Sequence, residues 1–209
     1  MSDELVFYTN PMSRGRIIRW MLEEIGAPYR TELLGYAGTM KAPAYLAINP
    51  MGKVPAITHG GVVVTECAAI CAYLADAFPA AGLAPPLAAR GSYYRWLFFA
   101  AGPVEAATTN KSLGVVVPPG KEMMAGYGSF ERTIDVLEAA VRAAPYIAGD
   151  SFTAADVYVG SQIGFSMRFG GIEKRPAFVE YWERVSTRPA AVRAAEIDDA
   201  LMAQATPAA

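Results

Sequence analysis

Residues 49–57 read Asn-Pro-Met-Gly-Lys-Val-Pro-Ala-Ile and lead directly into a hairpin. Short apolar runs flank the turn residues His59-Gly60-Gly61, which is a strong signal for two antiparallel strands. Pro55 stands at the entry to the first of these strands, where it cannot donate to the ladder and is a candidate for a cis peptide bond. A cis bond would leave the N–H and C=O of Val54 free to pair with the backbone of a short peptide. An ordinary loop with a trans proline is the alternative interpretation.

Upstream of this stretch, strand and helix patterns alternate. A short apolar run at 5–8 suits a buried strand, apolar residues at helical spacing follow at 16–25, and a second strand is expected at 29–34. Downstream of the hairpin, Thr65 is a candidate N-cap for a helix over 66–77. The first two strands need a crossover helix and are therefore parallel, whereas the hairpin adds antiparallel strands to the same sheet.

A linker rich in proline and glycine, 79–86, separates this half from a second half in which helical spacing dominates. The expected helices cover 90–107 (kinked by Pro103), 123–144, a segment that starts at Ala154 behind a capping box of Thr153 and Asp156, 177–186 and 189–203, with a loop at 112–120. The sequence therefore predicts an α/β domain over residues 1–80 and an all-α domain over residues 87–209.

Composition excludes several classes of function. Apolar residues make up 53% and charged residues 18% of the chain, which excludes a disordered protein and hints at an apolar surface covered by a second subunit, although a merely Ala-rich sequence explains it equally well. A net charge of -2 offers no field for nucleic acid or an anionic membrane, and no apolar run is long enough to span a bilayer. The acidic start at Ser2-Asp3-Glu4 is unlike a signal peptide. Cys67 and Cys71, four residues apart, indicate a reducing compartment, so a cytoplasmic protein is expected.

Ser13 stands between the first strand and the first helix, where an N-cap belongs. A capping serine is ordinarily structural, but backbone N–H groups and the helix dipole at such a place also favour an anion. A hydroxyl aimed outward could donate a hydrogen bond to a bound thiolate.

Two further features carry polar chemistry. Lys53 lies beside the candidate cis proline and could bind a carboxylate. The segment Thr65-Glu66-Cys67 opens another helix, whose free N–H groups form a second anion site, and a buried Glu66 could take an ammonium; a first-turn carboxylate that only complements the helix dipole is the commoner case. His59 is the only histidine and no cluster of metal-ligating residues is visible, so no metal is expected.

Together these features match a ligand with a thiol, an amide backbone, two carboxylates and an ammonium, and glutathione is such a molecule. The segments LVFYTNPMSRGRIIRWMLEEIGAPY, NPMGKVPAI, TECAAICAYL and FTAADV also follow in this order along the chain. In this respect the sequence resembles the cytosolic glutathione transferases over essentially its whole length, and in particular bacterial-type members with a serine-type active site. The resemblance implies a thioredoxin-like first domain, a helical-bundle second domain and glutathione as co-substrate.

The resemblance also implies roles for single residues. Ser13 would stabilise the glutathione thiolate, Val54 before Pro55 would pair with the cysteinyl backbone, and Lys53 would reach the glycine carboxylate. The residues placed around glutathione are Tyr8, Arg14, Lys53, Val54, Pro55, Glu66 and Cys67, of which Glu66 and Cys67 would hold the γ-glutamyl end. Thr153 and Asp156 would serve folding and not catalysis.

Two departures from the family pattern leave choices open. Many relatives have serine where this chain has Cys67, so the backbone N–H remains but a hydroxyl donor is lost. Tyrosine-type members activate the thiol from the end of the first strand, where this chain has Tyr8, so Ser13 and Tyr8 are both candidates. No cysteine lies in the segment around Arg14, which excludes a mixed disulfide through a first-helix cysteine.

The expected reaction is the addition of the glutathione thiolate to a small hydrophobic electrophile, as in cellular detoxification. Met12, Tyr94, Phe98 and Phe99 are the candidates for the apolar wall that holds the electrophile, although aromatic residues at helical spacing are more often core. Two alternatives remain: a glutathione-dependent disulfide or peroxide reductase or isomerase, and a non-catalytic interaction module. A homodimer is expected, with neither nucleic acid nor membrane as a partner.

Overall fold

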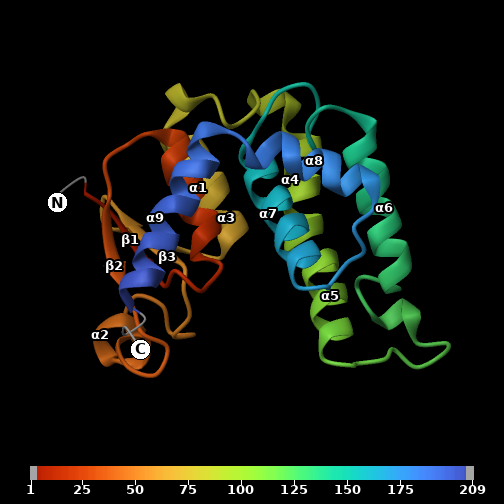
Figure 1. Cartoon of the computed structure of the whole chain (residues 1–209), viewed down its shortest axis with the longest axis horizontal. Helices are drawn as coiled ribbons and strands as arrows, with labels where there is room; N and C mark the ends of the chain where they lie inside the picture. Colours follow the sequence, from red (N-terminus) through yellow and green to blue (C-terminus); the bar gives the residue numbers. More distant parts are fainter. Residues whose placement is uncertain (1–3, 206–209) are drawn as a thin grey trace. The chain divides into compact units, whose positions relative to one another are not determined.

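The structure is a computed structural model that describes residues 4–205, and this part of the chain forms two compact units. The first unit runs up to Gly82 and also includes the chain from Arg188 onward; the second is Leu83–Thr187. Figure 1 shows the elements of both units. Among residues 4–205, no helix is both long and apolar enough to cross a membrane.

The first unit is built on a four-stranded sheet with the strand order β2-β1-β3-β4. Its strands are β1 (Leu5–Thr9), β2 (Arg30–Leu33), β3 (Ala56–His59) and β4 (Val62–Thr65). β1 runs parallel to β2 and antiparallel to β3, and β3 pairs antiparallel with β4. The positive φ values of Gly60 (55°) and Gly61 (85°) close the β3–β4 hairpin in the tight turn that the sequence predicts. The mixed sheet is thus confirmed.

The first unit also contains three longer helices, α1 (Gly15–Ile25), α3 (Cys67–Ala77) and α9 (Pro189–Ala205). The segment between β2 and β3 contains the short elements η1 (Thr39–Lys41) and α2 (Pro43–Leu46), and η2 (Pro79–Ala81) follows α3. α1 ends where Gly26 adopts the left-handed conformation, with φ of 66°. Packing of α1 against both α3 and α9 buries the apolar face of α1, and α9 (blue in Figure 1) lies beside α1 (red). The last helix of the chain therefore belongs to the first unit.

The second unit is helical. Its elements are η3 (Leu87–Ala89), α4 (Arg90–Phe99), η4 (Ala100–Val104), α5 (Glu105–Ser112), η5 (Glu122–Met124), α6 (Phe130–Ala143), α7 (Ala154–Arg168) and α8 (Pro176–Ser186). The expected interruption at Pro103 is confirmed as η4, a π-helical turn that carries this proline between α4 and α5. An α/β thioredoxin-like half followed by a helical half is the observed fold.

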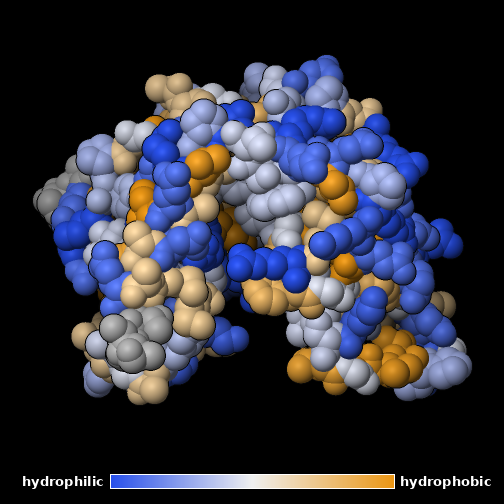
Figure 2. All heavy atoms as spheres, in the orientation of Figure 1, coloured by the Kyte–Doolittle hydropathy of each residue, from blue (hydrophilic) through white to orange (hydrophobic). Residues whose placement is uncertain are grey.

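The helix expected over 123–144 starts later than the sequence predicts. α6 begins at Phe130, and Ser129 caps it by accepting a hydrogen bond from the Arg132 N–H at 3.2 Å. Gly128, with φ of 68°, cannot continue a right-handed helix from the preceding turn. The apolar residues before it are instead exposed, and Figure 2 shows apolar side chains gathered over the segment between α5 and α6; they are Leu113, Val115, Val116, Met123 and Met124.

Candidate active site

Asn10 organises the turn that joins β1 to α1. Its side-chain Oδ1 accepts the Met12 N–H at 2.9 Å, and its Nδ2 donates to the Leu34 carbonyl at 2.8 Å. The turn is thereby tied to the chain just after β2, the strand that runs parallel to β1. These bonds hold the segment that carries Ser13 at the edge where β1 and β2 end.

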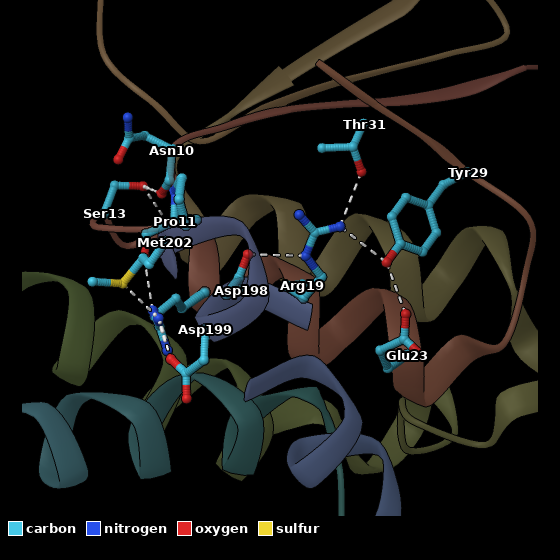
Figure 3. Close-up of polar contacts among 12 residues, drawn as sticks. Asn10, Pro11, Ser13, Arg19, Glu23, Tyr29, Thr31, Asp198, Asp199 and Met202 are labelled. Carbon is cyan, nitrogen blue, oxygen red and sulfur yellow. Dashed lines mark hydrogen bonds and ion pairs between the residues drawn. The ribbon is translucent and has the colours of Figure 1, made fainter. Parts of the chain in front are cut away.

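The Ser13 hydroxyl lies at the start of α1 and already has two partners. It donates to the Asn10 carbonyl at 2.7 Å and accepts the Gly15 N–H at 2.9 Å (Figure 3). The expected N-cap position is wrong by one residue, because α1 begins at Gly15 and Arg14 is its N-cap. Ser13 nevertheless satisfies one of the free N–H groups of the helix. Its hydroxyl is half-buried, and it can donate to a new acceptor only by releasing Asn10.

Gly15 is a requirement of this turn that sequence reasoning missed. A Cβ at this position would lie 1.9 Å from Oγ1 of the fully buried Thr9, so any larger residue would push the helix start away from β1. The close approach of α1 to the end of β1 depends on this glycine. A glycine in the first turn of an apolar helix is the signal that could have pointed to it.

The loop before β3 carries the second set of candidates. The Val54–Pro55 peptide bond is cis, as the sequence suggests. Val54 is half-buried, and neither its N–H nor its C=O has a hydrogen-bond partner among residues 4–205. Pro55 is buried, and the Lys53 side chain is exposed. A free backbone donor and acceptor just before the start of β3 are suited to pairing with an extended peptide.

Tyr45 and Asn49 hold the carbonyl of Lys53, and no local pattern in the sequence points to this role for Tyr45. The Lys53 oxygen accepts the Tyr45 hydroxyl at 2.6 Å and the Asn49 Nδ2 at 2.8 Å. Burial raises the pKa of Tyr45 to about 12, so the phenol keeps its proton and remains a donor. Tyr8 packs on the same small core, with its ring 5.7 Å from that of Tyr45.

The start of α3 differs from the expectation in two ways. The helix begins at Cys67 with Glu66 as its N-cap, whereas Thr65 was the expected cap. Glu66 is exposed and not buried, because it leaves the strand with φ of 65° and ψ of 120°. A residue other than glycine held in such a conformation costs on the order of 1–3 kcal/mol, and strain of this kind clusters at ligand sites.

Cys67 brings two of the three candidate segments together. Its half-buried thiol donates to the Arg14 carbonyl, with sulfur and oxygen 3.9 Å apart. The first residue of α3 thus touches the N-cap of α1, next to Ser13. Two helix N-termini lie side by side at this point, and the positive ends of their dipoles favour a ligand with anionic groups.

Comparison with known proteins gives the same family in both halves of the chain. Residues 12–77 match the family described as "Glutathione S-transferase, N-terminal domain", and residues 113–189 match "Glutathione S-transferase, C-terminal domain". Glutathione S-transferase 3 of Schizosaccharomyces pombe is 30% identical over 203 residues, which are 88% of this chain and 84% of the relative. The chain belongs to the glutathione S-transferase family. The expectation of a glutathione transferase enzyme is thereby confirmed.

Solved structures agree with this assignment. A glutathione transferase from Methylococcus capsulatus is 28% identical and superposes with a TM-score of 0.77, covering 94% of this chain and 99% of the other. A sphingomonad glutathione S-transferase, solved in complex with glutathione, is 26% identical with a TM-score of 0.75, covering 93% of this chain and 98% of that one.

The residues expected to form an apolar wall in this glutathione transferase differ in exposure. In the first unit, Met12 is 71% exposed. In the second unit, Phe98 is 71% exposed, Tyr94 is 38% exposed and accepts a hydrogen bond from Arg90, and Phe99 is half-buried with its ring 5.5 Å from that of Trp96. Phe99 is therefore partly used in the packing of its own helix, and the assignment of these four residues stays a prediction. Within residues 4–205, no group of three or more His, Cys, Asp and Glu side chains could hold a metal ion.

Proposed function

We propose that this glutathione transferase binds glutathione in its thioredoxin-like first unit, ionises the thiol with Ser13 and adds the thiolate to a small hydrophobic electrophile. The observation that carries the proposal is the Ser13 hydroxyl at the start of α1, which accepts the Gly15 N–H and lies next to the start of α3. The accepted hydrogen bond polarises the hydroxyl and makes it a better donor. Ser13 is thus the serine of a serine-type active site.

In this proposal the remaining candidates hold the tripeptide. The free N–H and C=O of Val54 pair with the cysteinyl backbone, while Lys53 is exposed and long enough to meet the glycine carboxylate. The N-terminal end of α3 at Glu66 and Cys67 receives the γ-glutamyl end, since a helix N-terminus attracts its carboxylate and the Glu66 side chain binds its ammonium. Arg14, Tyr8 and Pro55 complete the set of glutathione contacts.

The size of the effect of Ser13 follows from the bonds that it exchanges. A hydrogen bond to a thiolate contributes about 1.5–3 kcal/mol, and the bond to Asn10 that must be released is worth about 0.5–1.5 kcal/mol. The net gain is on the order of 1–2 kcal/mol, and each pKa unit corresponds to about 1.4 kcal/mol. Ser13 therefore lowers the thiol pKa by roughly one unit, and the helix dipole adds to this. The thiol proton goes to solvent. The thiolate sulfur then forms a bond to the electrophilic carbon, and either a leaving group such as chloride departs with the electron pair of the bond broken, or the π electrons of an activated double bond shift and that double bond takes up a proton from solvent.

A glutathione titration by calorimetry, in two buffers of different ionisation heat, tests this assignment. We expect wild type to release a proton on binding, Ser13→Ala to bind without release and to lose about tenfold in kcat/KM, and Ser13→Thr to retain the release because it keeps the hydroxyl. Release that persists in Ser13→Ala and disappears in Tyr8→Phe would assign the role to Tyr8. Binding without release in wild type would contradict thiol activation and favour a disulfide or peroxide reductase or isomerase. No binding at all would leave a non-catalytic module.

We infer a cytoplasmic homodimer of the bacterial type that acts in detoxification. Residues 1–80 are the glutathione-binding domain, residues 87–209 are the helical part of the chain, of which α9 packs within the first unit, and Met12, Tyr94, Phe98 and Phe99 are contacts of the electrophile. The exposed apolar side chains of Val62 and Val63 on the outer strand β4 support a covered surface. A sedimentation mass of one chain, 22.3 kDa, at micromolar concentration would contradict the dimer.

A further inference from the structure

Four ion pairs, three from α9 and one from Arg188 just before it, join this end of the chain to α1 and run in opposite order along the two segments. They are Arg16–Asp199, Arg19–Asp198, Glu23–Arg193 and Glu24–Arg188. The pairs of Arg19, Glu23 and Glu24 involve the later turns of α1, and Arg19 also contacts Tyr29 and Thr31 near β2. The first pair differs from the others because the same arginine also contacts the turn that carries Ser13.

Arg16 contacts α9 and the Ser13 turn at the same time. Its Nε donates to the Pro11 carbonyl at 2.7 Å, while its Nη2 donates to Asp199 Oδ1 at 2.6 Å and to Met202 Sδ at 3.0 Å (Figure 3). A guanidinium is a rigid planar fork, so fixing Nη2 from α9 also fixes the direction in which Nε points. Asp199 and Met202, three residues apart on α9, therefore set where the Nε donor lies.

The Pro11 carbonyl lies within the turn that is closed by the hydrogen bond from the Ser13 hydroxyl to the Asn10 carbonyl. Ser13 donates to the Asn10 carbonyl on one side of Pro11, and the Met12 N–H, on the other side, donates back to the Asn10 side chain. Rotation of the Pro11–Met12 peptide would disturb both bonds. By holding this peptide, Arg16 restrains the turn from which the Ser13 side chain projects.

We propose that Asp199 on α9 is a positioning residue for thiol activation: through Arg16 and the Pro11 carbonyl, it holds the turn that carries Ser13, so that the hydroxyl points at the glutathione thiol once it releases the Asn10 carbonyl. This inference rests on the proposed role of Ser13. The Arg16–Asp199 pair is 31% and 69% exposed on its two sides, so its loss changes the overall stability little. Its effect is on geometry, and a small misplacement of a reacting group lowers the rate strongly.

When Asp199 is removed, the loss of its charge and the loss of positioning shift the pKa of a bound thiol in opposite directions. Asp199 and Asp198 on α9 both interact with Arg16, and Arg14 and Arg19 lie two and three residues from it in the sequence. Removing the negative charge of Asp199 leaves a more positive surrounding and would lower the pKa of a bound thiol. Loss of positioning weakens the hydrogen bond from Ser13 and raises that pKa.

The test compares Asp199→Ala with Arg193→Ala, a control on the same helix that removes a half-exposed ion pair with Glu23 in the last turn of α1. The pKa of bound glutathione is read from thiolate absorbance as the pH is varied. We expect Asp199→Ala to raise it by about half a unit, with about a threefold loss of conjugation rate to a chlorinated dinitrobenzene below that pKa, and little loss above it. Asp199→Glu should restore the wild-type value, and Arg193→Ala should leave it unchanged.

A second readout needs no glutathione. The amide NMR shifts of Met12, Ser13 and Gly15 should change in Asp199→Ala and not in Arg193→Ala. An unchanged or lowered thiol pKa in Asp199→Ala overturns the inference, even where the amides move, because the contact is then only structural. A wrong proposed function would give a different result: either the wild-type protein would not lower the thiol pKa, or Ser13→Ala would leave that pKa low. In either case the proposed role of Asp199 would also be wrong.

Discussion

Asp156 in the second unit and Asp198 in the first are both almost wholly buried, with exposed fractions of 0% and 1%, yet they are stabilised by different means. Asp156 accepts four hydrogen bonds, two on each oxygen, from the Ile147 N–H, the Tyr181 hydroxyl and both the N–H and the hydroxyl of Thr153. None of these donors carries a full charge. Asp156 is thus stabilised by dipoles alone.

Asp198 instead faces a buried cation. Its Oδ1 accepts one hydrogen bond from Arg19 Nε at 3.2 Å, and Arg19 also donates to Tyr29 and Thr31 (Figure 3). Asp198 Oδ2 and Arg19 Nη2 are buried without a hydrogen-bond partner in the part of the chain that the structure describes. In the pair of Arg19 and Asp198 the two charges are of opposite sign, but one polar atom on each side chain has no hydrogen-bond partner among the described residues. Asp156 has four hydrogen bonds, and none of its hydrogen-bond donors is a cation. An ion pair of this kind is replaceable as a unit, while backbone donors cannot be removed together with their acceptor.

The largest effect is expected from Asp156→Asn. The amide group of asparagine would meet the donors of Thr153, so the buried Thr153 N–H would lose its acceptor. We expect a loss of about 4 kcal/mol in the free energy of unfolding, because charge-assisted bonds disappear and a buried donor is left unsatisfied. Urea unfolding measures it, with the exposed Asp150→Asn as a control that should change little. A loss below about 1 kcal/mol would show that dipoles contribute little to this buried carboxylate.

Breaking the ion pair is expected to cost less, and the cost should be recoverable. Asp198→Asn leaves Arg19 as a buried cation, which we expect to cost about 3 kcal/mol, because the rings of Phe7 and Tyr29 still lie against the guanidinium. Replacing both residues, with Arg19→Met and Asp198→Leu, should regain most of that loss. Glu196→Gln on the same helix is the exposed control. If the double variant is as unstable as Asp198→Asn, the pair is not replaceable as a unit and the contrast with Asp156 fails.

Local sequence explains one side of this comparison and not the other. Thr153 and Asp156 lie three residues apart, so the capping box could be predicted from spacing, and the structure confirms it. The donors Ile147 and Tyr181 come from outside that motif and left no local signal. Arg19 and Asp198 are 179 residues apart, and no periodicity relates two such positions.

The same distinction holds for the fold and the candidate site. The hairpin at Gly60-Gly61 could be predicted because its turn chemistry is local. The predicted start of α6 is too early, because Met123 and Met124 fit a helical pattern whereas the glycines after them do not. For the site, three local motifs gave the residues around Ser13, Val54 and Cys67. The contacts that hold them, from Tyr45 and from Asp199 through Arg16, are set by tertiary packing alone.

The smallest expected effect concerns pH. Burial raises the pKa of Asp156, against the hydrogen bonds it accepts, and burial also raises the pKa of Asp198, against the opposing charge of Arg19. Between the unfolded pKa and the raised folded pKa, the folded state binds more protons, so each carboxyl contributes stability that is complete below the unfolded pKa and is lost as the pH rises through the folded pKa. The stability advantage of wild type over each Asn variant should therefore shrink as the pH rises through this window.

The two carboxyls should then separate when one partner of each is removed. Arg19→Met removes a full charge and should raise the pKa of Asp198 further, which extends the window of falling stability to higher pH. Tyr181→Phe removes one dipole of four and should extend the window for Asp156 less, by an amount worth about 1 kcal/mol or less. Urea unfolding at a series of pH values from about 4 to 7 measures both. A larger extension of the window in Tyr181→Phe than in Arg19→Met would mean that a single hydroxyl stabilises a buried carboxylate more than an adjacent guanidinium does. That result would contradict the contrast between Asp156 and Asp198.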